Sequence, residues 1–286
     1  MNIISPSSHI KQEPESSVLY MVGTPIGNLN DLSPRALNVL KNVSLIACED
    51  TRQTKKLMSK FKFTNYLTSF NKHNSFKKIP ILINGLKQGK SIAIVSDAGL
   101  PGICDPGEDI VKEAKSKGFE IICIPGPCSA LTALVSSGLP SSRFIFQGFL
   151  PKKKKERERI LLEISKCEIT SILFESPHRL KKLLAELKEH CGSEREIQIF
   201  RELTKRFEEN IGSNINMILD FFEEKEVIGE ITIVIKGLNN QKKLTFDKFE
   251  LKKELNELTN AGLSLSAASK YLAKKNNLTK SIIYNL

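Results

Sequence analysis

The chain has 286 residues, of which 40% are hydrophobic and 26% charged, as is typical of a globular protein with one large domain or two. Pro125, Gly126 and Pro127 interrupt its longest apolar run, which excludes a helix long enough to cross a bilayer and predicts a cytoplasmic protein. The formal net charge of +11 favours a polyanionic partner such as nucleic acid, although a membrane surface or simple solubility would also account for a basic surface.

Neither metal nor disulfide chemistry is indicated. The six cysteines include no C-x-x-C pair, and the four histidines complete no metal-ligand spacing with them. We therefore expect reduced thiols and no bound metal.

Composition divides the chain into four predicted parts. Residues 1–17 are rich in Ser and Pro and offer little to bury, so they are predicted to form a disordered leader. An α/β domain is predicted over 18–141, a second over 142–238, and a helical segment over 239–286, in which 264–274 is the clearest helix.

Short apolar runs alternate with helix patterns through the first domain. Strands are predicted over 18–22, 43–48, 66–70, 92–95 and 120–124. Among the intervening helices, one begins with Ser33 as N-cap, one contains apolar residues 79–86, and one runs over 106–117 behind a capping box formed by Asp105 and Glu108. This alternation is typical of a parallel sheet covered by helices.

Three of these strands end in loops rich in Gly and Pro. The loops are GTPIGN (23–28), SDAGLPGICDP (96–106) and PGPCSA (125–130). Because ligands of parallel sheets bind outside the carboxyl ends of the strands, we expect the loops to converge and line a cleft. Their glycine spacing fits neither the G-x-G-x-x-G fingerprint nor a phosphate loop, so the common nucleotide-binding folds are not indicated.

The strand over 43–48 is followed directly by Glu49, Asp50, Thr51 and Arg52. Two carboxylates, a hydroxyl and a guanidinium at a strand end form a candidate site. Capping of the next helix by Asp50 or Thr51 explains the same residues equally well.

The second domain is predicted to contain strands over 144–149, 169–174, 196–200 and 230–235, and a helix over 214–222. Its basic run PKKKKERER (151–159) indicates either an RNA contact or a solvated helix start. In ESPHRL (175–180), Pro177 begins a helix and His178 is interpreted as a surface or capping residue rather than a catalytic one.

Taken together, the motifs resemble those of the S-adenosylmethionine-dependent tetrapyrrole-methylase-like family, and within it the enzymes that methylate small-subunit ribosomal RNA. The resemblance covers about residues 19–237. It rests on TPIGNL (24–29), LIACEDTR (45–52), SDAGLPGICDPG (96–107), IPGPCSA (124–130), GFLPKK (148–153), ESPHRL (175–180), RELTKRFEE (201–209) and GEI (229–231).

The resemblance implies a fold of two α/β domains with the cofactor in the cleft between them, plus a small C-terminal helical segment. It implies a homodimer that methylates the ribose 2′-oxygen of a cytidine in the decoding region of 16S ribosomal RNA, with free RNA or the ribosomal subunit as partner and no membrane. Two alternatives stay open: methylation of a small tetrapyrrole, and a non-catalytic RNA-binding assembly factor.

Residue roles follow as hypotheses. We expect the cofactor to be held by the three loops and by strand ends of the second domain, at Thr24, Pro25, Gly27, Asp97, Ala98, Gly99, Leu100, Pro101, Ser129, Ala130, Leu131, Phe174, Glu230 and Ile231. A 2′-hydroxyl needs a base to take its proton, and the candidates are Glu49, Asp50 and Glu202, with a purely structural ion-pair network as the alternative. RNA phosphates are expected to contact Arg52, Lys55, Lys56, Lys152, Lys153, Lys154, Lys155, Arg157, Arg179, Arg201 and Lys205.

Overall fold

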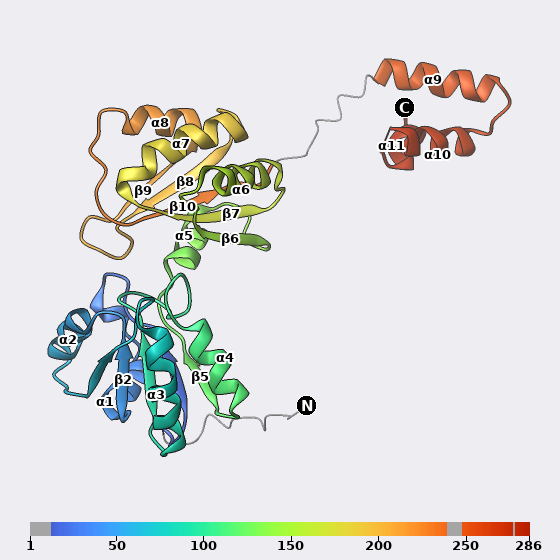
Figure 1. Cartoon of the computed structure of the whole chain (residues 1–286). Coiled ribbons are helices and arrows are strands. Elements are labelled where there is room, and N and C mark those ends of the chain that lie inside the picture. Colours follow the sequence, from blue (N-terminus) through green and yellow to red (C-terminus); the bar gives the residue numbers. More distant parts are fainter. Residues whose placement is uncertain (1–12, 239–247, 277) are drawn as a thin grey trace. The chain divides into compact units, whose positions relative to one another are not determined.

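The computed structural model describes residues 13–238, 248–276 and 278–286. The chain forms two compact units, residues 1–238 and 239–286, each of which is described by itself. The first unit contains two sheets, and we call the sheet-and-helix layers around them the first and second lobes (Figure 1).

The first lobe is built on five parallel strands in the order β3-β2-β4-β1-β5. The strands are β1 (Leu19–Val22), β2 (Leu45–Cys48), β3 (Leu67–Ser69), β4 (Ile92–Val95) and β5 (Ile121–Ile124). All five predicted strands are therefore present. They read as continuous apolar runs because both faces of the sheet are covered.

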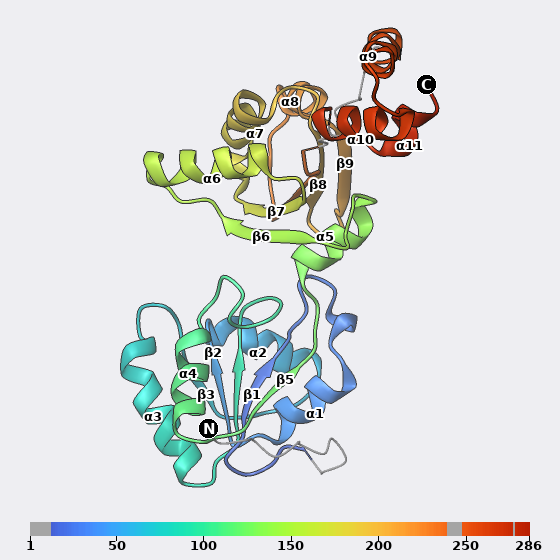
Figure 2. The same ribbon diagram turned by 90° about the vertical axis from the view of Figure 1, so that its right-hand side faces the viewer.

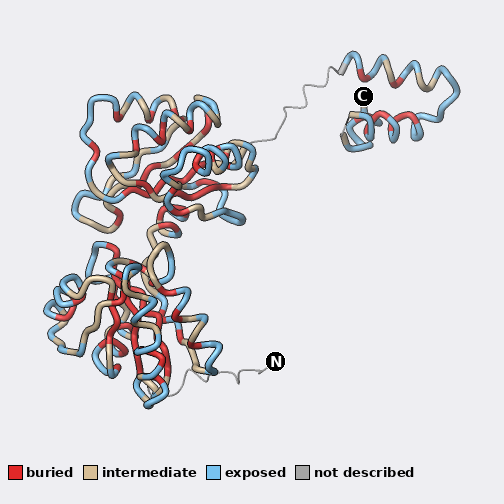
Figure 3. The backbone as a smooth tube through the Cα atoms, in the orientation of Figure 1, coloured by how far each residue is buried: buried red, intermediate tan, exposed pale blue. Residues whose placement is uncertain are grey.

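Alternate side chains of each strand enter different cores. In β1, Tyr20 and Val22 pack with α1 (Pro34–Asn42) and α2 (Thr51–Lys60) on one face. Leu19 and Met21 pack with α3 (Ser75–Lys87) and α4 (Glu108–Ser116) on the other. The buried backbone in Figure 3 follows these strands.

Helix starts were predicted with mixed success. Ser33 caps α1 and Asp50 caps α2, each by accepting a backbone N–H, which confirms the capping interpretation of Asp50. The predicted capping box at Asp105 is wrong, because α4 begins at Glu108 with Gly107 as its N-cap and no side-chain cap. The segment 102–107 is thereby left as loop, and Asp105 does not cap the helix.

The residues just before β1 are fixed to the first lobe. Glu13 accepts hydrogen bonds from the Arg35 guanidinium at 2.6 and 2.8 Å, and Ser16 Oγ donates to the Gly89 carbonyl at 2.6 Å. The prediction of a disordered leader is therefore wrong for residues 13–17, and residues 1–12 lie outside the described residues.

The second lobe has a mixed sheet in the order β6-β7-β10-β8-β9. Its strands are β6 (Phe144–Phe149), β7 (Thr170–Glu175), β8 (Glu196–Arg201), β9 (Glu209–Asn214) and β10 (Ile231–Ile235). Only β6 and β7 are parallel to each other. The edge strand β9 was not predicted, because its sequence ENIGSN has no apolar run and none of its residues is buried.

Helices cover both faces of this second sheet. One face packs against α6 (Lys154–Lys166), α7 (Pro177–Cys191) and α8 (Ile215–Phe222). The other packs against α5 (Ser129–Ser137), which lies beside the sheet in Figure 2. Its residues Ala130, Ala133 and Leu134 share a core with Ile172 and Val234 of the sheet. The domain boundary predicted at residue 141 would separate α5 from the sheet on which it packs.

In its described residues, 248–276 and 278–286, the second unit has three helices, α9 (Lys248–Asn260), α10 (Leu265–Lys275) and α11 (Lys280–Tyr284). Its core contains Leu251, Leu255, Ala268, Leu272 and Ile283. Ser264 caps α10 by accepting the Ala267 N–H, one residue before the helix begins. The predicted C-terminal helical segment is confirmed for the described residues.

The three glycine- and proline-rich loops meet at one edge of the first sheet, as predicted. Thr24 and Gly99 exchange backbone hydrogen bonds of 2.9 and 3.1 Å, which join the loops after β1 and β4. The loops after β1 and β5 touch through glycines: a Cβ on Gly126 would lie 2.7 Å from the Gly23 Cα. Both positions therefore require glycine.

We predict that Gly126→Ala destabilises the protein by about 1–3 kcal/mol, because the added methyl overlaps the Gly23 backbone, which cannot move aside without breaking this edge. Urea unfolding would measure the loss. Gly85→Ala adds the same methyl inside α3, where the nearest atom is the end of the Ile92 side chain at 3.2 Å, and should be close to neutral. Equal losses in the two variants would contradict the proposed role of the glycine contact.

Candidate active site

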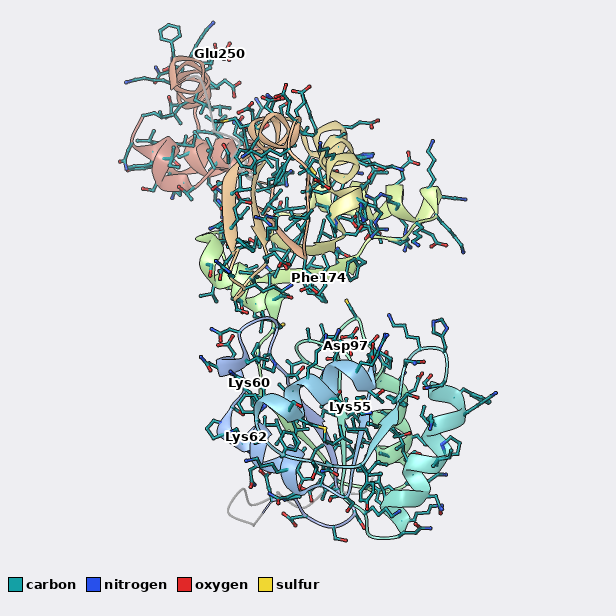
Figure 4. All side chains as sticks on the ribbon, turned by 90° about the vertical axis from the view of Figure 1, so that its left-hand side faces the viewer. Lys55, Lys60, Lys62, Asp97, Phe174 and Glu250 are labelled. Atoms are coloured by element: carbon teal, nitrogen blue, oxygen red, sulfur yellow. The ribbon has the colours of Figure 1, made fainter. Side chains whose placement is uncertain are left out.

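A cavity of about 390 Å³ lies between the two lobes of the first unit, and we call it the cleft. The first lobe contributes the ends of β1, β2 and β4 with their loops, and the second contributes the ends of β7 and β10. Asp97 and Phe174 extend from the facing sides of the two lobes in Figure 4. This is the cleft that the loop pattern predicts.

Eight of the fourteen predicted cofactor residues line the cleft. They are Asp97, Ala98, Gly99, Leu100, Ser129, Phe174, Glu230 and Ile231. They lie in the loop after β4, at the start of α5, near the end of β7 and at or just before the start of β10.

The other six predicted cofactor residues do not line the cleft: Thr24, Pro25, Gly27, Pro101, Ala130 and Leu131. Thr24 is buried, with its hydroxyl directed at the Ser96 and Gly99 carbonyls. Ala130 belongs to the core under α5, whereas the Leu131 side chain on the same helix is exposed. These positions shape the loops and do not face the cavity.

Sequence reasoning missed thirteen lining residues. They are Ile26, Ile103, Cys104, Asp105, Cys128, Phe149, Glu175, Ser176, Pro177, Phe200, Leu203, Gly229 and Thr232. Most of them are next to a predicted residue in the same sequence motif. Extending the prediction from single residues to the whole motif would have included them. Phe149, Phe200 and Leu203 depend on how the second sheet packs.

The second lobe supplies an apolar wall. Phe174 packs edge-on against Phe146 at 5.0 Å and against Phe149 at 5.6 Å between ring centroids. Phe200 and Ile231 continue this surface and are themselves buried. A flat organic group entering the cleft would find aromatic and aliphatic contacts on this side.

The first lobe supplies carboxylates. Partial burial and then the neighbouring Asp97 carboxylate raise the pKa of Glu49. Partial burial also raises the pKa of Asp97, although the Asp50 backbone N–H, which donates to Asp97 Oδ1 at 3.0 Å, opposes that rise. Partial burial and then Glu49 raise the pKa of Asp105 to about 6. Three carboxylates in the same cleft, each with a raised pKa, favour a cationic ligand.

The other two predicted bases lie outside the cleft lining. Asp50 is bound to its own helix and to the Arg52 guanidinium, which lowers the pKa of Asp50 to about 2. Burial works to raise the pKa of Glu202, but hydrogen bonds from Lys205 Nζ and the Glu230 N–H leave that pKa lowered. Both carboxylates are engaged in the ion-pair arrangement that was the alternative interpretation.

The predicted RNA contacts differ in availability. Lys55 and Lys56 on α2 and Lys152, Lys154 and Lys155 before and within α6 are exposed, with no ion pair in the described part of the chain. Figure 4 shows Lys55 on α2.

The remaining predicted RNA contacts have acidic partners within the protein. These pairs are Arg52 with Asp50, Lys153 with Glu156, Arg179 with Glu175, Arg201 with Glu209, and Lys205 with both Glu202 and Glu230.

The prediction for Arg157 is wrong. Its side chain is 8% exposed and lies between Glu186, to which Arg157 Nε donates at 2.7 Å, and Glu175, whose Oε2 is 3.8 Å from Arg157 Nη2. A guanidinium buried between two carboxylates does not reach an RNA phosphate. The periodicity of α6 turns this residue of the basic run toward α7.

Within residues 13–238, 248–276 and 278–286, no cluster of His, Cys, Asp and Glu could hold a metal ion. Nor is any helix within them both long and apolar enough to pass through a bilayer.

Comparison with known proteins agrees with this geometry. Residues 18–216 match the family model for tetrapyrrole (corrin/porphyrin) methylases. The chain is 40% identical over 269 residues to "Ribosomal RNA small subunit methyltransferase I" of Synechocystis sp., covering 94% of this chain and 96% of that one. The Bacillus subtilis protein of the same name is 40% identical over 275 residues, with 95% and 94% covered.

The relative of that name in Thermotoga maritima is 45% identical over 219 residues, which are 98% of its length but only 77% of this chain. Solved structures share the fold at lower identity. Cobalt precorrin-4 methyltransferase superposes with a TM-score of 0.60 at 17% identity, covering 77% of this chain and 95% of that one.

Uroporphyrin-III C-methyltransferase from Thermus thermophilus, solved with S-adenosylhomocysteine, gives a TM-score of 0.54 at 14% identity, with 77% and 96% covered. The motifs, the two-lobed fold and these matches lead to one conclusion. The chain belongs to the tetrapyrrole (corrin/porphyrin) methylase family.

Proposed function

We propose that the chain transfers a methyl group from S-adenosylmethionine to the ribose 2′-oxygen of a cytidine in the decoding region of 16S ribosomal RNA. The observation that carries the proposal is the distribution of charge. The described cleft lining contains five carboxylates and no lysine or arginine, whereas the whole chain has a net charge of +11. A cationic methyl donor suits the cleft, and a polyanionic substrate suits the surface around it.

The cleft residues fit the methyl donor in size and chemistry. A cavity of about 390 Å³ lies within the range of small-molecule sites. Glu175 and Glu230 are paired with Arg179 and Lys205, which leaves Glu49, Asp97 and Asp105 to face a cation. When bound, S-adenosylmethionine supplies an electrophilic methyl group on a positively charged sulfur.

The apolar side of the cleft and its acidic side are proposed to bind different parts of the methyl donor. Phe174 and Ile231 hold the adenine by apolar contact, and the backbone of Ala98–Leu100 approaches it closely from the other side. Asp97 binds the charged end of the donor. Methyl transfer is an in-line displacement, so holding the oxygen, the methyl and the sulfur in line is the main contribution of the protein.

The 2′-hydroxyl must lose its proton as its bond to the methyl carbon forms. Of the three predicted bases only Glu49 lines the cleft, and Asp105 lines it too. We assign proton acceptance to these two carboxylates, of which Glu49 raises the pKa of Asp105, and treat them as a pair. A pKa near 6 suits a base that works at neutral pH.

RNA is held outside the cleft. Lys55, Lys56, Lys152, Lys154 and Lys155 are exposed and have no ion pair in the described part of the chain, so they are available to phosphates. A cytoplasmic location goes with a ribosomal substrate.

A homodimer is also proposed. Leu131 and Val135 form an exposed stripe on α5, with 47% and 79% of their surface accessible, and Phe144 and Ile145 are exposed on the edge strand β6. Large exposed apolar side chains on a helix and on a sheet edge are typical of a subunit interface.

Asp97→Ala is expected to weaken S-adenosylmethionine binding about tenfold, because a carboxylate facing the cation is lost. Isothermal titration calorimetry would measure the affinity. Asp109→Ala removes an exposed carboxylate of α4 that does not line the cleft and should leave the affinity unchanged. Unchanged binding by Asp97→Ala would remove Asp97 from the site.

The rate of methyl transfer is expected to rise as the pH increases through about 6, because the Glu49–Asp105 pair accepts a proton only when ionised. Asp105→Asn should lower the rate and change this acidic limb in single-turnover assays, whereas Asp50→Asn should not, since Asp50 titrates near 2. An acidic limb that is identical in the wild type, Asp105→Asn and Asp50→Asn would disprove the assignment.

Because folding raises the pKa of Asp105 to about 6, keeping this carboxylate ionised at neutral pH costs stability. Asp105→Asn should therefore unfold at a higher urea concentration than the wild type at neutral pH.

The substrate class is tested by offering labelled S-adenosylmethionine with either small-subunit RNA or a tetrapyrrole. We expect methyl transfer to the RNA alone, with a steep fall in binding as salt increases. Replacing Lys152, Lys154 and Lys155 with Ala should reduce the salt dependence by about three phosphate contacts. The control is Ala at Lys112 and Lys117, which are paired with glutamates on α4. Transfer to the tetrapyrrole, or RNA binding without transfer, would favour one of the two alternatives.

A further inference from the structure

A second cavity, of about 460 Å³, opens beside the cleft, and we call it the side groove. It is lined by Pro177, His178 and Lys181 from the start of α7 and by residues 225–229 before β10. Pro177 and Gly229 line both cavities, so the side groove adjoins the cleft. If the ribose of one nucleotide enters the cleft, the rest of the RNA strand has to leave the cleft along a neighbouring surface, and the side groove is such a surface.

The two cavities differ in charge. The side groove contains two cations, Lys181 and Lys225, against the single carboxylate of Glu226, and the His178 imidazole also lines it. The described lining of the cleft is acidic, with no lysine or arginine. Phosphates of a bound strand are therefore repelled by the cleft itself and attracted to the groove next to it.

The two groove lysines have no carboxylate partner among the described ion pairs. Lys181 Nζ donates to the Glu223 carbonyl at 3.0 Å, and Lys225 Nζ lies 3.3 Å from the centroid of the Phe221 ring. Their neighbours on α7 are engaged, since Lys182 pairs with Glu186 and Lys188 Nζ donates to Asn216. The charge of Lys181 and Lys225 is therefore held in place and available to an anion.

The groove is not only basic. Val227 is buried beneath it, and Ile228 has 59% of its surface exposed. An apolar surface beside two cations fits a nucleotide, which has both a phosphate and a flat base, better than it fits a free anion.

We propose that the side groove holds the nucleotide next to the one that is methylated, with its phosphate on Lys181, Lys225 and His178 and its base on Ile228. This inference rests on the proposed RNA substrate and assigns the path of the strand out of the cleft. It also gives the ESPHRL motif a role in substrate binding through His178, which was interpreted from sequence as a surface or capping residue.

The test compares two double variants of the full chain. Lys181→Ala with Lys225→Ala should raise the KM for small-subunit RNA at least about fivefold and reduce the slope of log affinity against log salt by about two. The kcat at saturating RNA and the calorimetric affinity for S-adenosylmethionine should be unchanged. The control, Lys182→Ala with Lys188→Ala, removes the same charge from α7 outside the groove and should leave the KM as in the wild type.

Three other outcomes would contradict either the groove assignment or the proposed function. An unchanged KM in the groove variant, with an active wild type, would overturn the groove assignment and leave the proposed function intact. Loss of S-adenosylmethionine affinity in the groove variant would overturn it too, by making the groove part of the cofactor site. A wild-type chain that transfers no methyl group to RNA would instead overturn the proposed function.

Discussion

The first lobe depends on the close contact of three loops at one edge of its sheet. Gly23 and Gly126 touch through their backbones, and Thr24 pairs with Gly99 as two short strands would. These contacts are possible because β1 lies between β4 and β5. They fix the direction in which the loop after β4 leaves the sheet, and hence the position of Asp97 at the cleft.

The strands of the first lobe were predictable because each is buried on both faces and therefore reads as an apolar run. The same logic fails for β9, which lies at a sheet edge and carries polar residues and a glycine. Strand order was not predictable, since it depends on which faces pack together. The sequence around Asp105 fits a capping box, but Gly107 is the N-cap of α4 instead. The backbone of Gly107 lies close to Gly102, and this contact fixes where α4 can begin.

The residues of the candidate site likewise include some that were predictable from the sequence and some that were not. Asp97–Leu100 were predicted because a loop directly after a buried strand has only one edge of the sheet to occupy. Glu175, Ser176 and Pro177 were missed because their place in the lining depends on how the second lobe faces the first. Arg157 shows the limit of charge counting, since a run of basic residues does not tell which of them turns inward to Glu186.

The acidic cleft and the basic surface set opposite conditions for the two ligands of the proposed reaction. Phosphates gain nothing by entering the cleft, so only a ribose turned away from its strand can reach the methyl donor, and its neighbours must stay at the rim. In the proposed reaction, Glu49, Asp97 and Asp105 would attract the positively charged donor. A product without that charge would be held less strongly by the same carboxylates, so the arrangement that binds the donor would also favour release of the product.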